Sequence, residues 1–98
     1  MFKFKDEYHP KVEKDLRVID KSVRSEIKDF HIPEILKNPY PYIADELTGD
    51  LKGIFSYHFK KNKVQYRVSY IIDNAQKIVY ILRIGKREGY YEILRRRL

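Results

Sequence analysis

Hydrophobic side chains in the first third of the chain recur every three or four residues. Between Tyr8 and Phe30 they fall at Val12, Leu16, Ile19, Val23, Ile27 and Phe30. This spacing places them on one face of an amphipathic helix, so we predict a helix across residues 8–30. Before it, "FKF" at 2–4 alternates, and we expect a short strand there.

The segment "HIPEILKNPYP" predicts a second, short helix. Pro33 is well tolerated in a first helical turn, and Asn38 followed by Pro39 ends the helix. The two helices would form an N-terminal helical hairpin.

After residue 53 the hydrophobic period shortens to two. "IFSYHFK", "VQYRVSYIID" and "KIVYILRIG" predict three strands joined by hairpin connections at "KKNK" and "DNAQK". Residues 88–97 predict a short C-terminal helix. The fold class we expect is α+β: residues 1–98 form a single domain whose helical hairpin packs on a small antiparallel sheet.

Charge points to the kind of partner. The chain has 21 Lys+Arg against 14 Asp+Glu, a net charge of +7, which favours nucleic acid or an acidic protein. The absence of cysteine excludes disulfides, zinc–thiolate sites and cysteine nucleophiles. The three histidines lack zinc spacing, and no phosphate-loop motif is present, so we expect no metal and no cofactor. No apolar run is long enough for a membrane span, and no signal peptide is evident, so we expect a cytoplasmic protein without membrane contact.

Strand alternation predicts a polar face. If Phe55, Tyr57 and Phe59 point to the core, Ser56, His58 and Lys60 point the opposite way. Arg67 on the next strand and Arg87 after the third would join them. One sheet face would then carry Ser56, His58, Lys60, Arg67 and Arg87, with Tyr90 and Tyr91 at its rim. The predicted RNA-binding residues are Lys52, Ser56, Lys61, Lys63, Lys86, Tyr90, Arg95 and Arg96.

A basic groove formed by this polar face would suit cleavage of RNA by its own 2′-hydroxyl. Arg67, among side chains that favour partial burial, either pairs with an acid or awaits a phosphate. A fixed guanidinium stabilises the charge that develops on the phosphoryl oxygens. A His, Tyr or Lys can act as acid or base, and aromatic rings can stack on unpaired bases. A non-catalytic RNA-binding domain fits the same composition.

The stretch "LTGDLKGIFSYHFKKNKVQYRVSYIID…IVYILRIGKREGYYEILRRRL" resembles the RelE/ParE superfamily of bacterial toxin–antitoxin toxins. The motifs "YRVSY" and "IGKRE" in this order carry the resemblance, which covers about the last half of the chain by motif. The RelE branch implies a metal-independent endoribonuclease that cleaves mRNA in the ribosomal A site, where it also contacts 16S rRNA. It also implies an acidic antitoxin, encoded by the adjacent gene, and a toxin–antitoxin hetero-oligomer.

The resemblance also assigns residues, and with it the predicted catalytic residues are Arg67, Arg87, Tyr91, His58 and Lys60. Arg67 and Arg87 match the arginines that stabilise the scissile phosphate, and the C-terminal tyrosine matches Tyr91, or Tyr90 if the gap shifts by one. The strand-two lysine pair falls on Ser56 and His58, and of these only His58 could serve as an acid or base. Thr48 also stands where the archetype has an arginine.

Two other functions remain open on the sequence. A ParE-like inhibitor of DNA gyrase would share the fold, although such chains generally lack the second arginine, the C-terminal tyrosine and the polar strand-two face. A catalytically degenerate RNA-binding member is the other, favoured by Ser56 and Thr48.

Overall fold

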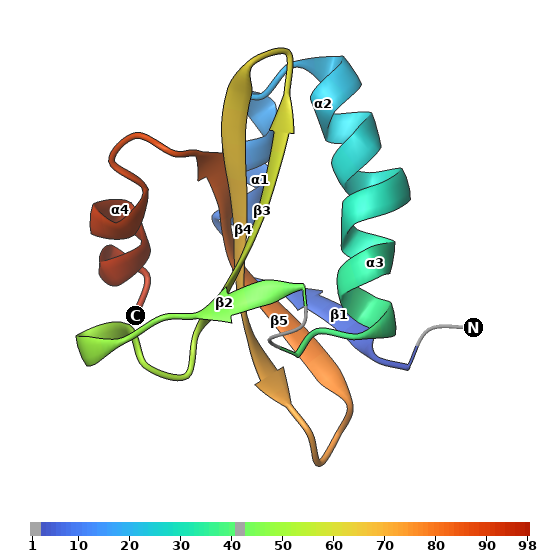
Figure 1. Ribbon diagram of the computed structural model, residues 1–98, viewed down its shortest axis with the longest axis vertical. Helices are drawn as coiled ribbons and strands as arrows, with labels where there is room; N and C mark the ends of the chain where they lie inside the picture. The colour runs from blue at the N-terminus through green and yellow to red at the C-terminus, as the bar shows by residue number, and fades with distance from the viewer. Residues whose placement is uncertain (1–2, 41–42) are drawn as a thin grey trace.

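A five-stranded mixed sheet organises the chain in the order β1-β5-β4-β3-β2 (Figure 1). The computed structural model describes residues 3–40 and 43–98. The strands are β1 (Lys5–Tyr8), β2 (Ala44–Glu46), β3 (Phe55–Lys61), β4 (Val64–Asp73) and β5 (Ile78–Lys86). β1 pairs with β5 in parallel, and the other neighbours are antiparallel. The three predicted strands are confirmed, but the sheet is larger than expected and not wholly antiparallel.

The helices lie before and after this meander. They are α1 (Val12–Arg17), α2 (Lys21–Glu26), α3 (Ile32–Lys37) and α4 (Tyr90–Arg96), with a π-helical turn (Ile27–His31) and a 3₁₀ turn (Gly49–Leu51). Within the described ranges, no helix has the length and apolar character needed to cross a membrane. The short C-terminal helix predicted at residues 88–97 is confirmed as α4.

The predicted N-terminal helical hairpin is not confirmed. The first element is β1, which begins at Lys5, and Phe2 of the predicted strand lies outside the described residues. The chain breaks between α1 and α2, at residues 18–20, instead of near Pro33. From α2 to α3 it forms one continuous rod through the π-helical turn (Figure 1).

The π-helical turn explains why Pro33 does not end the helix. Here the Ile32 N–H bonds to the carbonyl of Ile27, five residues earlier. A wider turn accommodates a residue that lacks an N–H and whose ring crowds the preceding turn. It also advances the buried face by one position, so His31 is 5% exposed whereas Phe30, predicted to face the core, is 53% exposed.

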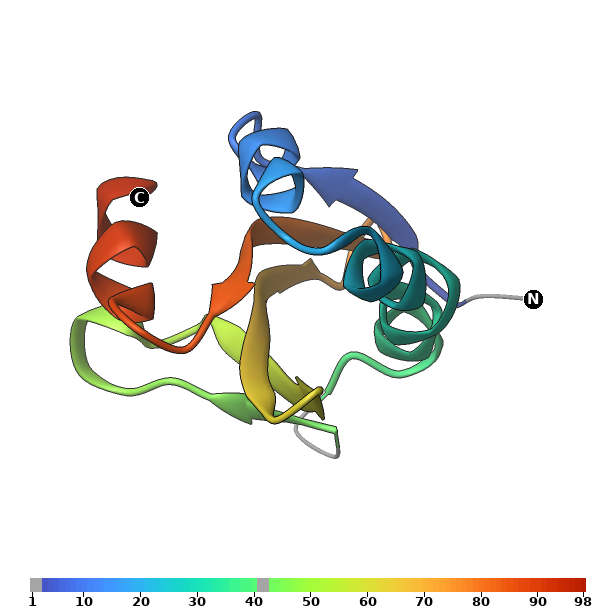
Figure 2. The ribbon, with the colours of Figure 1, turned by 90° about the horizontal axis from the view of Figure 1, so that it is seen from above.

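Helices cover both faces of the sheet (Figure 2). The main core lies between β4, β5 and helices α1–α3, and its fully buried side chains include Val23, Ile35, Val68, Tyr70, Val79 and Ile81. A smaller cluster lies under α4 and consists of Leu51, Ile54, Leu82, Tyr90 and Leu94. The α4 face therefore has its own apolar support beside the polar positions of β3 and β4.

The β3–β4 hairpin fixes the register of the polar face. Asn62 and Lys63 have φ values of 53° and 66°. Two successive positive φ angles define the two-residue turn whose twist matches a β-hairpin. The turn places Lys61 opposite Val64 and thereby His58 opposite Arg67.

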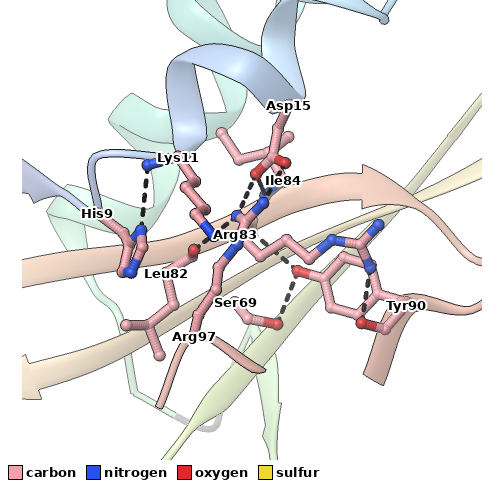
Figure 3. Close-up of polar contacts among 9 residues, drawn as sticks. All are labelled: His9, Lys11, Asp15, Ser69, Leu82, Arg83, Ile84, Tyr90 and Arg97. Atoms are coloured by element: carbon pink, nitrogen blue, oxygen red, sulfur yellow. Dashed lines mark hydrogen bonds and ion pairs between the residues drawn. The ribbon is translucent and has the colours of Figure 1, made fainter. Parts of the chain in front are cut away.

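Side chains cover the edge of β5 where β1 ends. The last backbone bond from this side is from the His9 N–H to the Ile81 carbonyl, at 2.8 Å. Beyond it, Arg97 Nη1 donates to the Leu82 carbonyl at 3.0 Å, and the Ile84 N–H donates to Asp15 Oδ2 at 3.1 Å (Figure 3). Asp15 and Arg97 thus satisfy the part of the β5 edge that lies beyond the end of β1.

Candidate active site

Three neighbouring strands bring the central polar residues together. His58 on β3 is the Cα partner of Arg67 on β4, and Arg67 is the partner of Gly85 on β5. The ladder continues past β5, because the Arg87 N–H donates to the Gln65 carbonyl at 3.1 Å. Since side chains alternate across a strand, His58, Arg67 and Arg87 are placed on the face that carries α4.

Arg67 stacks on an aromatic ring instead of pairing with an acid. Its guanidinium carbon lies 5.1 Å from the centroid of the Tyr91 ring. Its Nε is buried without a hydrogen-bond partner, and among residues 3–40 and 43–98 it has no ion pair. Between the two alternatives for Arg67, the contacts favour a guanidinium whose donors are not taken up by a carboxylate.

The two adjacent tyrosines have different surroundings. Tyr90 is 1% exposed, and its hydroxyl bonds to Ser69 Oγ and to the Arg83 carbonyl, each at 2.8 Å. Burial raises the pKa of Tyr90 well above its usual range, although Ser69 and Arg83 act in the opposite direction. Tyr91 is half-buried beside Arg67. The RNA contact predicted for Tyr90 does not fit its burial, and Tyr91 is the tyrosine that reaches the polar face.

His58 is placed to act as a neutral imidazole. Partial burial of its ring, followed by the positive charge of Arg67, lowers the pKa of His58, and Asp45 offsets part of this effect. A pKa below its ordinary value of 6.5 leaves the ring uncharged near neutral pH. A neutral imidazole next to a guanidinium can accept a proton close to the place where an anion would be held.

Three predicted RNA-binding residues do not lie on this surface as expected. Ser56 is fully buried and its hydroxyl has no hydrogen-bond partner. Lys61 lies on the helix side, where its Nζ donates to Glu26 at 2.7 Å. Lys86 pairs in register with Tyr66, whose side chain is in the main core. Strand alternation separates Lys61 and Lys86 from the α4 face, while Lys60 remains exposed on it.

The remaining predicted cations surround the site at a distance. Lys52, Lys63, Arg95 and Arg96 are all exposed. Arg95 Nε lies 2.8 Å from Asp50 Oδ2, an exposed ion pair that joins α4 to the 3₁₀ turn. Lys52 and Thr48 line a hollow of about 390 Å³ next to that turn. The four cations add positive charge to the surface, but no contact joins them to His58, Arg67 or Arg87 among the described residues.

Two arginines with buried side chains, Arg83 on β5 and Arg97 directly after α4, were not among the predicted site residues. Arg97 forms a bidentate ion pair with Asp15, at 2.5 and 2.6 Å, and the two side chains are 7% and 9% exposed. Arg83 is 8% exposed, and its Nη1 donates to the Tyr90 carbonyl at 2.6 Å (Figure 3). The available signal was a lone arginine inside the β-branched run "IVYILRIG", where a charged side chain is unusual.

A separate groove lies on the opposite face of the sheet, beside β1 and helices α1–α3. It has a volume of about 1080 Å³ and an apolar floor that includes Phe4, Leu16, Ile27, Ile32 and Leu36. Its rim carries five cations, Lys5, Arg17, Lys21, Arg24 and Lys28, and two acids, Asp6 and Glu13. An apolar floor with a mainly cationic rim favours a partner that combines apolar and acidic side chains.

Comparison with known proteins identifies the family. A family model described as the ParE-like toxin of type II bacterial toxin–antitoxin systems matches residues 7–95. The chain belongs to the ParE-like toxins. No curated protein matches this toxin in sequence.

Solved structures share the fold of this ParE-like toxin. A chain of the RelBE2 toxin–antitoxin complex of Mycobacterium tuberculosis is 23% identical with a TM-score of 0.75, over 86% of this chain and 98% of that one. A double arginine-to-alanine variant of the E. coli toxin RelE in the free state is 23% identical with a TM-score of 0.72, over 100% of both. A chain of the archaeal RelE–RelB complex from Pyrococcus horikoshii is 24% identical with a TM-score of 0.59, over 88% and 97%. The fold is therefore RelE-like.

Proposed function

We propose that this toxin is a ribosome-dependent endoribonuclease that cleaves mRNA in the A site without a metal ion. The observation that carries the proposal is the environment of Arg67. Its guanidinium has no acidic partner in the described part of the chain, lies against Tyr91 and faces His58 across the strand pair. Arg67 is half-buried, and a cation that is partly removed from water without a carboxylate carries a cost that a bound phosphate would relieve.

The reaction we propose uses the substrate's own 2′-hydroxyl. Its oxygen forms a bond to the adjacent phosphorus, the bond from phosphorus to the 5′-oxygen of the next nucleotide breaks, and His58 or Lys60 accepts the 2′ proton. The leaving 5′-oxygen takes up a proton from a protonated acid or water. Arg67 and Arg87 stabilise the charge that develops on the phosphoryl oxygens, and Tyr91 holds Arg67 in place.

Mapping mRNA ends after induced expression tests the proposal. The reaction above leaves a 2′,3′-cyclic phosphate on the upstream fragment and a 5′-hydroxyl on the downstream fragment. Cuts within codons that carry these ends would support it. Cells that stop growing while mRNA stays intact would refute it.

Inhibition of DNA gyrase is the second candidate, favoured by the match to the ParE-like family model. The same induced cells distinguish the two, because a gyrase inhibitor would produce DNA breaks and leave mRNA uncut. A chain that binds ribosomes but causes neither effect would be a degenerate RNA-binding member, consistent with the burial of Ser56.

We further infer that the toxin acts in the cytoplasm and is neutralised by an acidic antitoxin encoded beside it. Two similar solved structures are toxin–antitoxin complexes, from M. tuberculosis and P. horikoshii. The cation-rimmed groove on the helix side has the charge and apolar floor that an acidic amphipathic segment would match.

A further inference from the structure

Arg83 is a buried cation whose hydrogen-bonding capacity is only partly used. It is 8% exposed, with its guanidinium carbon 4.2 Å from the centroid of the Tyr90 ring. Nη1 donates to the Tyr90 carbonyl at 2.6 Å, but Nε is buried without a partner, and Nη2 has none among the described residues. Burial lowers the pKa of Arg83, and Tyr90 and Asp15 compensate in part.

The nearest buried acid is already occupied. Both carboxylate oxygens of Asp15 bond to Arg97, and one of them also accepts the Ile84 N–H (Figure 3). The buried set of Asp15, Arg83 and Arg97 therefore carries one positive charge more than it carries negative charges. Burying a charge without a partner is costly, so this excess calls for an explanation.

Gly85 leaves room for the Arg83 guanidinium on the polar face. A Cβ at Gly85 would lie 3.1 Å from Arg83 Nη2 and 3.3 Å from its guanidinium carbon. Gly85 is also the cross-strand partner of Arg67. Side chains at paired positions share one face with Cβ atoms about 4.5–5.5 Å apart, so Arg83 Nη2 lies over the position next to Arg67.

We propose that Arg83 is an additional phosphate-binding residue of the RNA site, donating from Nη2 to a phosphate that lies over Gly85 beside Arg67. The proposal rests on the RNA-directed function proposed above. Two guanidinium groups on one strand pair offer planar sets of donors that match phosphate oxygens. The bound phosphate would balance the excess charge, which the protein's own carboxylates do not.

A purely structural role is the competing explanation. In that case Arg83 holds the first turn of α4 through the Tyr90 carbonyl and contributes nothing to anion binding. The two explanations differ in what Gly85→Ala does. The added methyl group would crowd Nη2 without removing the Arg83 side chain, and the backbone of Gly85 does not need a positive φ.

The test is a titration of the folded chain with inorganic phosphate, at constant ionic strength, followed by the Nε–H NMR signals of its arginines. We expect the Arg67 and Arg83 signals to shift together. Arg83→Met should weaken phosphate binding about tenfold, the size expected for losing a charged hydrogen bond. Gly85→Ala should weaken it in the same direction, and the matched control Lys37→Gln, an exposed position at the end of α3, should not.

Unchanged phosphate affinity in Gly85→Ala, with Arg67 alone responding to phosphate, would overturn the proposal, even if Arg83→Met fails to fold. The phosphate titration uses neither ribosomes nor mRNA, so its result is independent of the mRNA mapping that tests the nuclease function. Phosphate binding that depends on Arg83 in a chain that leaves mRNA intact would refute the nuclease function alone. Cleavage that is unaffected by Gly85→Ala, with unchanged phosphate affinity, would refute the role of Arg83 alone.

Discussion

Arg67 and Tyr91 meet across two elements, with the guanidinium carbon of one 5.1 Å from the ring centroid of the other. Arg67 belongs to β4 and Tyr91 to the first turn of α4. The contact therefore ties the orientation of the central cation to the docking of the C-terminal helix. A cation–π contact of this kind is worth about 0.5–2 kcal/mol.

Tyr91→Leu should reduce mRNA cleavage because Arg67 loses the ring that orients it, whereas Tyr91→Phe should retain most of the activity. The measurement is the single-turnover cleavage rate on ribosomes with a defined A-site codon. Equal impairment of both variants would show that the hydroxyl group, not the ring, is required.

Arg67→Ala and Arg87→Ala should each lower that cleavage rate by about 10²–10³-fold, because each removes a group that stabilises charge on the phosphoryl oxygens. Arg67→Lys should also be impaired, since a lysine keeps the charge but loses the planar set of donors. Lys37→Gln is the control for loss of one positive charge. Full toxicity of Arg87→Ala in cells would contradict the assignment.

His58 should remain neutral to a lower pH than an ordinary histidine. Partial burial and the charge of Arg67 lower its pKa below 6.5, so cleavage should decline only as the pH falls through this lowered pKa. Arg67→Gln removes one cause and should raise the pKa of His58 in an NMR titration. If the pKa of His58 is the same in wild type and Arg67→Gln, Arg67 does not tune this residue.

Arg97→Met should lower the free energy of unfolding by about 3–5 kcal/mol, because it leaves the buried Asp15 carboxylate without its cation. Urea denaturation measures this, and the double variant Asp15→Asn/Arg97→Met should recover part of the loss. The control is Arg95→Met, whose ion pair with Asp50 is exposed and should matter far less. Equal losses from the two arginine variants would contradict the role given to the buried pair.

Reversing the rim charge with Lys21→Glu and Lys28→Glu together should weaken binding of the acidic antitoxin proposed above, most strongly at low salt. Isothermal titration calorimetry at two salt concentrations measures this. Lys37→Gln should bind as the unchanged chain does. An unaltered affinity at low salt would place the antitoxin elsewhere.

Local pattern accounts for much of the fold. Alternation from Phe55 onward and the turn at Asn62 and Lys63 were sufficient to predict β3, β4 and β5. β1 was misplaced because its residues, Lys5–Tyr8, are all exposed and carry no apolar alternation, and its partner strand begins at Ile78. The face of the long helix was predicted correctly only as far as Ile27, since the π-helical turn then exchanges Phe30 for His31.

The residues of the candidate site also fall into two groups, those that local pattern predicts and those that depend on distant contacts. His58, Arg67 and Arg87 were predicted because strand alternation and a local motif place them. Arg83 and Arg97 were not, because their roles depend on α4 packing over β5 and on Asp15, which lies 82 residues from Arg97. In the sequence, Arg97 cannot be told apart from its exposed neighbours Arg95 and Arg96.

The C-terminal helix protects the chain from aggregation, because its docking keeps the edge of β5 covered. Arg97 covers the Leu82 carbonyl and also holds Asp15, which covers the Ile84 N–H. Anything that lifts α4 from the sheet would release that carbonyl and leave Asp15 without its cation. An uncovered strand edge is a template for a strand from another molecule. Chains that lose their last residues should therefore tend to associate edge to edge as well as unfold more easily.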